Sequence, residues 1–273
     1  MSRLRKTWVW WTAALALTLA SQPSVANGDL ADHAWNKRLR AAHFADRPIV
    51  TSDNVIQLHM PEQAEDPTVV PVTIYAMLPQ TDERYIKKVT LLIDLNPVPL
   101  AGVFKFTPKS GRADISLRVR INDVTPVRAI AELNDGTLHM SRTMVYASGG
   151  CSAPVGEDLA VALKRAGKMK LSIGPNQPDD APVSSKLRIR HPNITGMQTV
   201  GGQFTPAHYV RTVNIRMNDE IIFSAETDIS VSADPFFGFY IAGSESGTMV
   251  AEVTDSSGAT FTKEVAVRGA PQQ

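Results

Sequence analysis

The stretch Ile115-Ser116-Leu117-Arg118-Val119-Arg120-Ile121 decides the fold of this chain, because apolar and polar side chains alternate along its whole length. Successive side chains of a β-strand point to opposite faces of a sheet, so the alternation indicates a strand with one buried face. Runs of similar character, separated by Asn, Asp, Gly and Pro, occur at residues 55–60, 70–78, 89–95, 102–106, 127–133 and 138–146. Short Val-, Ile- and Thr-rich runs with such turn signals predict an immunoglobulin-like β-sandwich.

The second half of the chain shows the same kind of pattern from residue 187 to 217, and then at 221–229, 237–242, 249–254 and 260–267. Asn134-Asp135-Gly136 in the first half and Asp255-Ser256-Ser257-Gly258 in the second suit hairpin turns, because Gly accepts a positive φ there. Residues 174–185 contain three prolines and little that is apolar, which is typical of a linker. We therefore predict one domain over residues 27–173, a linker over 174–185 and a second domain over 186–273.

Two helices are expected beside the strands. Residues 29–44 lack Gly and Pro and place Leu30, Ala34, Leu39 and Ala42 at roughly helical spacing. Residues 156–166 form a second helical pattern, with Gly167 as its stop signal. The predicted fold class is therefore all-β: two immunoglobulin-like β-sandwich domains, an N-terminal helix and a short inter-domain helix.

Residues 1–26 have the composition of a cleaved secretory signal peptide. Basic residues lie at positions 3, 5 and 6, an apolar run covers 8–20, and Ser24-Val25-Ala26 is a small-residue cleavage site. We expect an exported, periplasmic protein with no membrane anchor after cleavage. The 273 residues carry 28 Lys and Arg against 27 Asp and Glu, a net charge of +1, so no basic excess favours nucleic acid as a partner.

Cys151 is the one cysteine of the sequence, and it lies in Gly149-Gly150-Cys151-Ser152-Ala153-Pro154. A lone cysteine forms no internal disulfide, which leaves a buried inert thiol, a disulfide-linked homodimer or a reactive carrier. Two glycines beside the sulfur favour the carrier, because they allow a bendable, exposed turn in which Gly149 and Gly150 act as a hinge. Pro154 also suggests a helix N-terminus near the sulfur, which would lower the thiol pKa, whereas Glu157 and Asp158 would oppose that effect.

Several motifs together resemble a family. The first half is similar to SoxY-type sulfur carriers and the second to SoxZ, so the chain looks like the fused SoxYZ-like carrier that accompanies quinoprotein dehydrogenases. The resemblance rests on residues 60–66, 70–74, 93–100, 127–129 and 149–151, and in the second half on His191-Pro192, 195–197, 205–209 and 231–237. In SoxY-type carriers the cysteine lies in a tail at the chain end, whereas here a helix is expected to follow it.

The resemblance implies a non-catalytic carrier of a sulfur intermediate in thiosulfate oxidation, bound covalently to Cys151 and presented to periplasmic sulfur-oxidising or quinoprotein dehydrogenase enzymes. An alternative is a passive adaptor of a dehydrogenase, in which Cys151 is dispensable. A third hypothesis is a copper-binding protein that uses Cys151 with Met140 and Met144, although strand methionines are usually core residues.

The remaining residues give no chemical motif. We find no serine-histidine-acid, phosphate-loop or dinucleotide pattern and expect no enzyme activity and no cofactor. The six histidines, at positions 33, 43, 59, 139, 191 and 208, lack ligand spacing, so no metal site is expected. Asp94-Leu95-Asn96-Pro97 is interpreted as a turn, the arginines of residues 118–128 as a solvated sheet face, and Phe236, Phe237, Phe239 and Tyr240 as core or inter-domain packing.

Overall fold

The structure is a computed structural model that describes residues 32–154, 158–178, 181–200, 203–243 and 246–267. The signal peptide predicted for residues 1–26 lies outside the described residues, as does the start of the helix predicted for 156–166. Within the described part of the chain, no helix is both long enough and apolar enough to cross a membrane.

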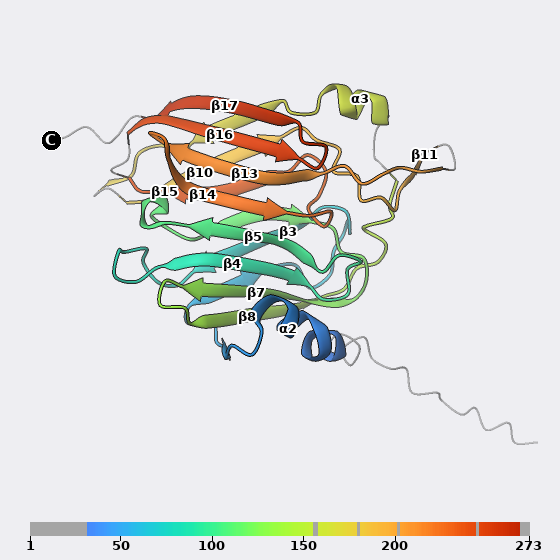
Figure 1. Cartoon of the computed structure of the whole chain (residues 1–273), viewed down its shortest axis with the longest axis horizontal. Helices are drawn as coiled ribbons and strands as arrows, with labels where there is room; N and C mark the ends of the chain where they lie inside the picture. The colour runs from blue at the N-terminus through green and yellow to red at the C-terminus, as the bar shows by residue number, and fades with distance from the viewer. Residues whose placement is uncertain (1–31, 155–157, 179–180, 201–202, 244–245, 268–273) are drawn as a thin grey trace, which may run out of the picture.

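Two large sheets pack face to face (Figure 1). The larger, nine-stranded sheet has the order β1 (Ile49–Thr51), β8 (Leu138–Val145), β7 (Thr125–Leu133), β4 (Ile86–Ile93), β5 (Leu100–Phe106), β14 (Glu220–Thr227), β13 (Val210–Met217), β16 (Gly247–Asp255) and β17 (Thr260–Val267). The six-stranded sheet has the order β2 (Ile56–His59), β3 (Val70–Ala76), β6 (Ile115–Val119), β15 (Phe236–Ile241), β10 (Val183–Ile189) and β9 (Met169–Ile173). The all-β prediction is confirmed.

Short elements complete the described chain. They are a π-helix η1 (Trp35–Leu39), the helices α2 (Arg40–Phe44) and α3 (Leu159–Lys164), a 3₁₀ turn η2 (Pro108–Ser110) and a hairpin of β11 (Thr199–Val200) with β12 (Gln203–Phe204). The predicted turn glycines Gly136, Gly167 and Gly258 have φ values of +88°, +82° and +90°, a region that Gly enters without the penalty of a Cβ atom.

Both sheets are continuous between the two halves of the chain. Strand β5 pairs antiparallel with β14, and β6 pairs with β15. The buried residues of the two halves form one core, in which the Phe223 ring lies 5.4 Å from that of Phe106 and 5.3 Å from that of Phe239. Phe237 and Phe239 are buried, so the predicted packing of these aromatic residues is confirmed. The two halves therefore join edge to edge through strand pairing as well as through side-chain contacts.

The segment interpreted from the sequence as the linker, residues 174–185, connects two neighbouring strands of one sheet, and its last three residues already belong to the second strand, β10. Strand β9 precedes the segment and pairs antiparallel with β10, with Ile173 opposite Ser185. The chain thus passes at β9 into the part of the six-stranded sheet that the second half forms, after α3 and before the proline-rich segment.

The N-terminal helix covers the outer face of the nine-stranded sheet. Trp35, Leu39 and Phe44 are buried there against Leu92 and Ile130 of β4 and β7. The predicted helix is confirmed from residue 32 to 44, and Leu39 is buried as predicted, whereas Leu30 lies outside the described residues. Ala42 is exposed, and Trp35 and Phe44 are the other buried side chains. A π-helix has more residues in each turn than an α-helix, so η1 shifts the angular positions of the residues that follow it.

Candidate functional site

The segment that carries the cysteine is fixed at two places along its backbone. At its start, the Tyr146 N–H donates to Glu62 O at 2.7 Å. Further along, the N–H groups of Gly149 and Gly150 donate to Asn122 O and Ile121 O at 2.9 and 3.0 Å. The segment therefore runs along the chain just after β6 instead of projecting as a free arm.

The two glycines have different structural roles. Gly149 has a φ of +76°, and a Cβ atom at this position would meet no atom within 4 Å. A Cβ atom on Gly150 would lie 2.2 Å from Pro67 O and 2.5 Å from Ile121 O, both of them backbone atoms. Gly150 is thus required by close backbone contact. The expectation that both glycines form an open hinge is wrong for this conformation, because Gly150 is buried between the segments that contain Pro67 and Ile121.

Cys151 is buried, with 0% of its surface exposed. Its carbonyl oxygen accepts a 2.7 Å hydrogen bond from Thr195 Oγ1, which belongs to the second half of the chain. Burial raises the thiol pKa from 9.0 to about 11, although the positive charge of Arg120 acts in the opposite direction. The prediction of an exposed sulfur is therefore wrong for the conformation described, in which the loop after β10 contacts the cysteine segment and Arg120.

Arg120 joins the cysteine segment to the second half. This buried side chain donates from Nη2 to Asn193 O at 3.2 Å and from Nη1 to Gly150 O at 3.5 Å. Burial lowers the pKa of its guanidinium, and the Cys151 and Asp66 charges oppose that shift. The interpretation of the arginines as a solvated face is wrong for Arg120 and Arg128, because loops or the N-terminal helix cover the outer faces on which they lie.

The helix that follows the cysteine begins too late to stabilise a thiolate. Asp158 caps α3, and its carboxylate accepts hydrogen bonds from the N–H groups of Ala160 and Val161. The free N–H groups that would favour a nearby anion are thus satisfied by Asp158, and a helix dipole acts only within its first turn. The predicted effect of a helix N-terminus is not among the causes that shift the pKa of Cys151, which are burial and the charge of Arg120.

Met140, one residue of the copper hypothesis, belongs to a buried cluster that does not contain Cys151. Met140 is buried beneath the N-terminal helix, in the cluster that contains Trp35.

Asp94 lies in a turn as predicted, but its buried carboxylate accepts a 2.7 Å hydrogen bond from Arg128 Nε. The guanidinium of Arg128 also lies 4.5 Å from the centre of the Trp35 ring. These contacts attach the helix to the sheet.

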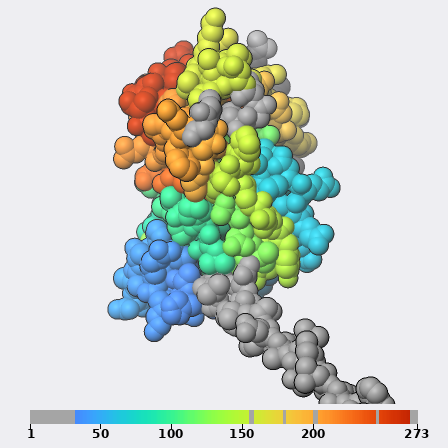
Figure 2. Space-filling view, turned by 90° about the vertical axis from the view of Figure 1, so that its right-hand side faces the viewer, coloured from blue at the N-terminus to red at the C-terminus, as the bar shows by residue number. Residues whose placement is uncertain are grey.

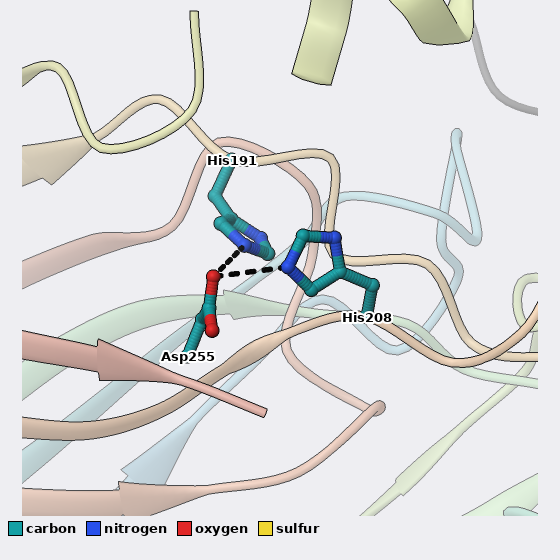
Figure 3. Close-up of side chains that lie close together, drawn as sticks. All are labelled: His191, His208 and Asp255. Atoms are coloured by element: carbon teal, nitrogen blue, oxygen red, sulfur yellow. Dashed lines mark hydrogen bonds and ion pairs between the residues drawn. The ribbon is translucent and has the colours of Figure 1, made fainter. Parts of the chain in front are cut away.

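The fold brings together three groups that sequence reasoning did not connect (Figure 3). Asp255 Oδ2 lies 2.9 Å from His208 Nε2 and 3.6 Å from His191 Nε2. One ligand atom from each of the three residues lies within 4.8 Å of the others. The expectation of scattered histidines is thus wrong for this pair. Their motifs were visible in the sequence, but the distant partner at the end of β16 was not.

The charges in this cluster follow from its burial and hydrogen bonds. Burial, together with the neighbouring His208, lowers the pKa of His191. Burial would raise the pKa of Asp255, but hydrogen bonds from Ser257, His208 and Ala259 outweigh it and lower the pKa to about 2. Asp255 is therefore a carboxylate at neutral pH, beside two imidazole rings whose centres are 4.6 Å apart.

The fold and site define an all-β sandwich protein of two paired halves, in which the one cysteine of the sequence lies where the halves meet. Residues 40–151 match the family described as "Sulfur oxidation protein SoxY", and residues 173–266 match "Sulphur oxidation protein SoxZ". The chain belongs to these two sulfur oxidation families as a fused SoxY–SoxZ protein, as the sequence motifs indicated. No curated protein matches the chain.

Among solved structures, the chain is similar to the sulfur carrier protein SoxY from Chlorobium limicola f thiosulfatophilum, with 23% identity over 44% of this chain and 96% of that one and a TM-score of 0.37. It is also similar to a superoxide reductase (neelaredoxin) from Ignicoccus hospitalis, with 16% identity over 36% of this chain and 94% of that one and a TM-score of 0.33. A putative superoxide reductase from Thermotoga maritima gives 20% identity, coverage of 36% and 92%, and a TM-score of 0.31.

Proposed function

We propose that this protein is a periplasmic, non-catalytic carrier that holds a sulfur intermediate as a covalent adduct on Cys151 Sγ. Membership of the SoxY and SoxZ families supports a carrier role in sulfur oxidation, and the SoxY match ends at Cys151 itself. That position is the single observation that carries the proposal. A periplasmic location is proposed from the signal-peptide pattern of residues 1–26.

Because Cys151 is buried, the proposal requires the segment around it to open before cargo is loaded. The closed segment is held by backbone hydrogen bonds and by the Thr195 hydroxyl, and its neighbours Gly149, Gly150 and Ser152 bury no large apolar side chain. Local opening of a surface segment with so few contacts costs much less free energy than global unfolding. The closed conformation then protects the thiol, and the open one exposes it.

Loading is proposed as an exchange that conserves electrons. The Cys151 thiolate forms a new S–S bond with one sulfur of a disulfide-type donor, and the donor's S–S bond breaks. The departing sulfur takes the electron pair, and the thiol proton passes to solvent. A second nucleophile on a downstream enzyme reverses the step and regenerates the thiolate.

Partner enzymes would dock at the end of the molecule that carries this segment. The chain after β8 leads along that end to α3, and the β11–β12 hairpin lies at the same end (Figures 1 and 2). Val161, Leu163 and Phe204 expose 56%, 42% and 74% of their surfaces on these elements. We propose sulfur-oxidising or quinoprotein dehydrogenase enzymes as the partners.

Tetrathionate tests the carrier directly, because a thiolate cleaves its central S–S bond, keeps one thiosulfate unit and releases the other. We expect native protein to gain this single adduct slowly, as measured by intact mass spectrometry, and Cys151→Ser protein to gain none. Cys151→Ser is a nearly isosteric control that leaves the segment closed. Modification that begins only when the whole protein unfolds would refute a carrier that loads through local opening.

The burial of Cys151 favours one competing function, a passive adaptor that presents the two fused halves to a dehydrogenase. An adaptor needs the surface but not the thiol. In cells that lack the protein, the Cys151→Ser variant should restore sulfur or substrate oxidation if the protein is an adaptor and should fail to restore it if the protein is a carrier.

A further inference from the structure

We propose that His191, His208 and Asp255 form a binding site for a divalent transition-metal cation of the zinc type. Two imidazole nitrogens and one carboxylate oxygen make up a donor set that Zn²⁺ binds in proteins, with a water molecule as the fourth ligand. The site lies in the second half of the chain, and the proposal does not depend on the chemistry of Cys151.

The distances between the three groups suit such a cation. A tetrahedral Zn²⁺ with bonds of about 2.0 to 2.1 Å separates its ligand atoms by about 3.3 Å. Asp255 Oδ2 lies 2.9 Å from His208 Nε2 and 3.6 Å from His191 Nε2, on either side of that value (Figure 3). The ligand atoms of all three residues lie within 4.8 Å of one another, so rotation of the imidazole rings can bring them to this separation.

An unpartnered buried atom indicates a missing ligand. The His191 side chain is fully buried, and its Nε2 has no hydrogen-bond partner, although it faces the Asp255 carboxylate. An orphaned polar atom in such a position is unfavourable unless an ion or water satisfies it. A hydrogen bond between His208 and Asp255 alone leaves this nitrogen unsatisfied, whereas a bound cation satisfies all three groups.

Neighbouring residues orient the ligands. Asn193 contacts His191 Nδ1 through two groups, its side-chain Oδ1 at 2.8 Å and its backbone N–H at 3.1 Å. We assign the proton to Nδ1, because Asn193 Oδ1 also accepts from the Val210 N–H while Asn193 Nδ2 donates to Val231 O, and this assignment leaves the lone pair of Nε2 for the cation. Asp255 Oδ1 accepts hydrogen bonds from the backbone N–H groups of Ser257 and Ala259 and from the Ser257 hydroxyl, so Oδ2 is left to face the histidines. Supporting contacts of this kind are typical of metal sites in proteins.

A cation can reach the site from solvent through His208. Its side chain is 24% exposed, whereas those of His191 and Asp255 are 0% and 3% exposed. The arrangement therefore has two buried ligands and one ligand at the surface.

Chelator-treated protein, freed of its signal peptide, tests the site by calorimetric titration with Zn²⁺ and by the visible absorption of bound Co²⁺. We expect one equivalent to bind. His208→Gln keeps a hydrogen-bonding side chain beside Asp255 but removes the imidazole, and it should weaken binding at least ~100-fold, since even the loss of a supporting contact costs ~10- to 100-fold. His59→Gln makes the same change on the exposed face of β2 and should leave binding unchanged.

Far-UV circular dichroism establishes that each variant is folded. If His208→Gln does not fold, the ring-nitrogen NMR shifts of His191 and His208 in the unmodified sequence decide the question, because Zn²⁺ moves both only when both are ligands. Absence of saturable binding, or equal affinity in the His208→Gln variant, overturns the proposal. Tetrathionate modification of Cys151 is measured on metal-free protein, so failure of the metal site leaves that result intact.

Discussion

Replacement of Gly150 by alanine should expose Cys151 by destabilising the closed segment. In the unmodified protein, opening breaks the hydrogen bonds of Gly149, Gly150 and Cys151 to Asn122, Ile121 and Thr195. At about 1 kcal/mol for each bond and about 1 kcal/mol for burial of the sulfur, opening costs about 4 kcal/mol. The thiol is then accessible in about one molecule in a thousand, and we expect labelling by iodoacetamide ~1000-fold slower than that of an unfolded cysteine.

The new methyl group would lie 2.2 Å from Pro67 O and 2.5 Å from Ile121 O. Both atoms belong to backbone, so the segment itself must move, at a cost of about 2 kcal/mol for overpacking. We therefore expect Gly150→Ala to be labelled ~30-fold faster than the unmodified protein. Gly136→Ala is the matched control, because it strains a positive φ in a distant, open turn.

The labelling rate and the global stability together show whether Cys151 becomes exposed by local opening of its segment or by complete unfolding. The control should lose stability in urea without faster labelling, whereas Gly150→Ala should show both effects. If the rates of both variants instead follow their global stability, Cys151 is exposed only by complete unfolding. If the unmodified protein labels as fast as a free cysteine, the segment is not closed in solution.

Four further results are expected. Burial raises the Cys151 pKa from 9.0 to about 11, so the closed state favours the protonated thiol. The stability that this thiol gives to the closed state is fully present below pH 9 and is lost as the pH rises to about 11. Labelling, corrected for the thiolate fraction of a free cysteine, should accelerate across this range, and a flat profile contradicts the raised pKa. Thr195→Val removes the 2.7 Å hydrogen bond to the Cys151 carbonyl and should speed labelling ~5-fold, by about 1 kcal/mol; an unchanged rate would show that this bond does not hold the segment. Asp94→Asn removes the buried counterion of Arg128 and leaves only the exposed carboxylate of Asp32, 3.4 Å away, so it should lower the free energy of unfolding by about 3 to 5 kcal/mol. Glu226→Gln in an exposed pair should lower it by less than about 1 kcal/mol. The protein expressed as two chains divided after residue 178 should purify as a one-to-one complex held by the β5–β14, β6–β15 and β9–β10 pairs; separation of the chains on a sizing column would contradict this.

The strands were predictable because alternation records which face of each strand is buried. The run at residues 115–121 contains β6, and the turn at Gly136 joins β7 to β8 as its Asp-Gly sequence indicated. The joining of both halves into shared sheets was not predictable in this way. Alternation describes the faces of a strand, whereas the pairing of β5 with β14 depends on its edges.

The candidate site could be predicted only in part for the same reason. The Gly-Gly-Cys sequence identified the segment, but the groups that bury it, Thr195 and Asn193 among them, come from the distant second half. Local sequence therefore predicted flexibility where tertiary contacts impose close packing. His191 and His208 were similarly dismissed on their spacing, although the fold, rather than the spacing, brings them to Asp255.

These contacts give the second half of the chain a definite part in the proposed chemistry. Thr195 and Asn193 lie in the same loop as His191. Thr195 donates a hydrogen bond to the Cys151 carbonyl, and the Asn193 carbonyl accepts one from Arg120, so the loop holds the cysteine segment closed. In separate subunits such a cover would dissociate with its partner, whereas fusion keeps it at high effective concentration. A thiol with a pKa of about 11 in the closed state reacts only when this loop releases it. We therefore propose that the SoxZ half controls access to the cysteine of the SoxY half, so that a docking enzyme that displaces the loop would set the moment of transfer.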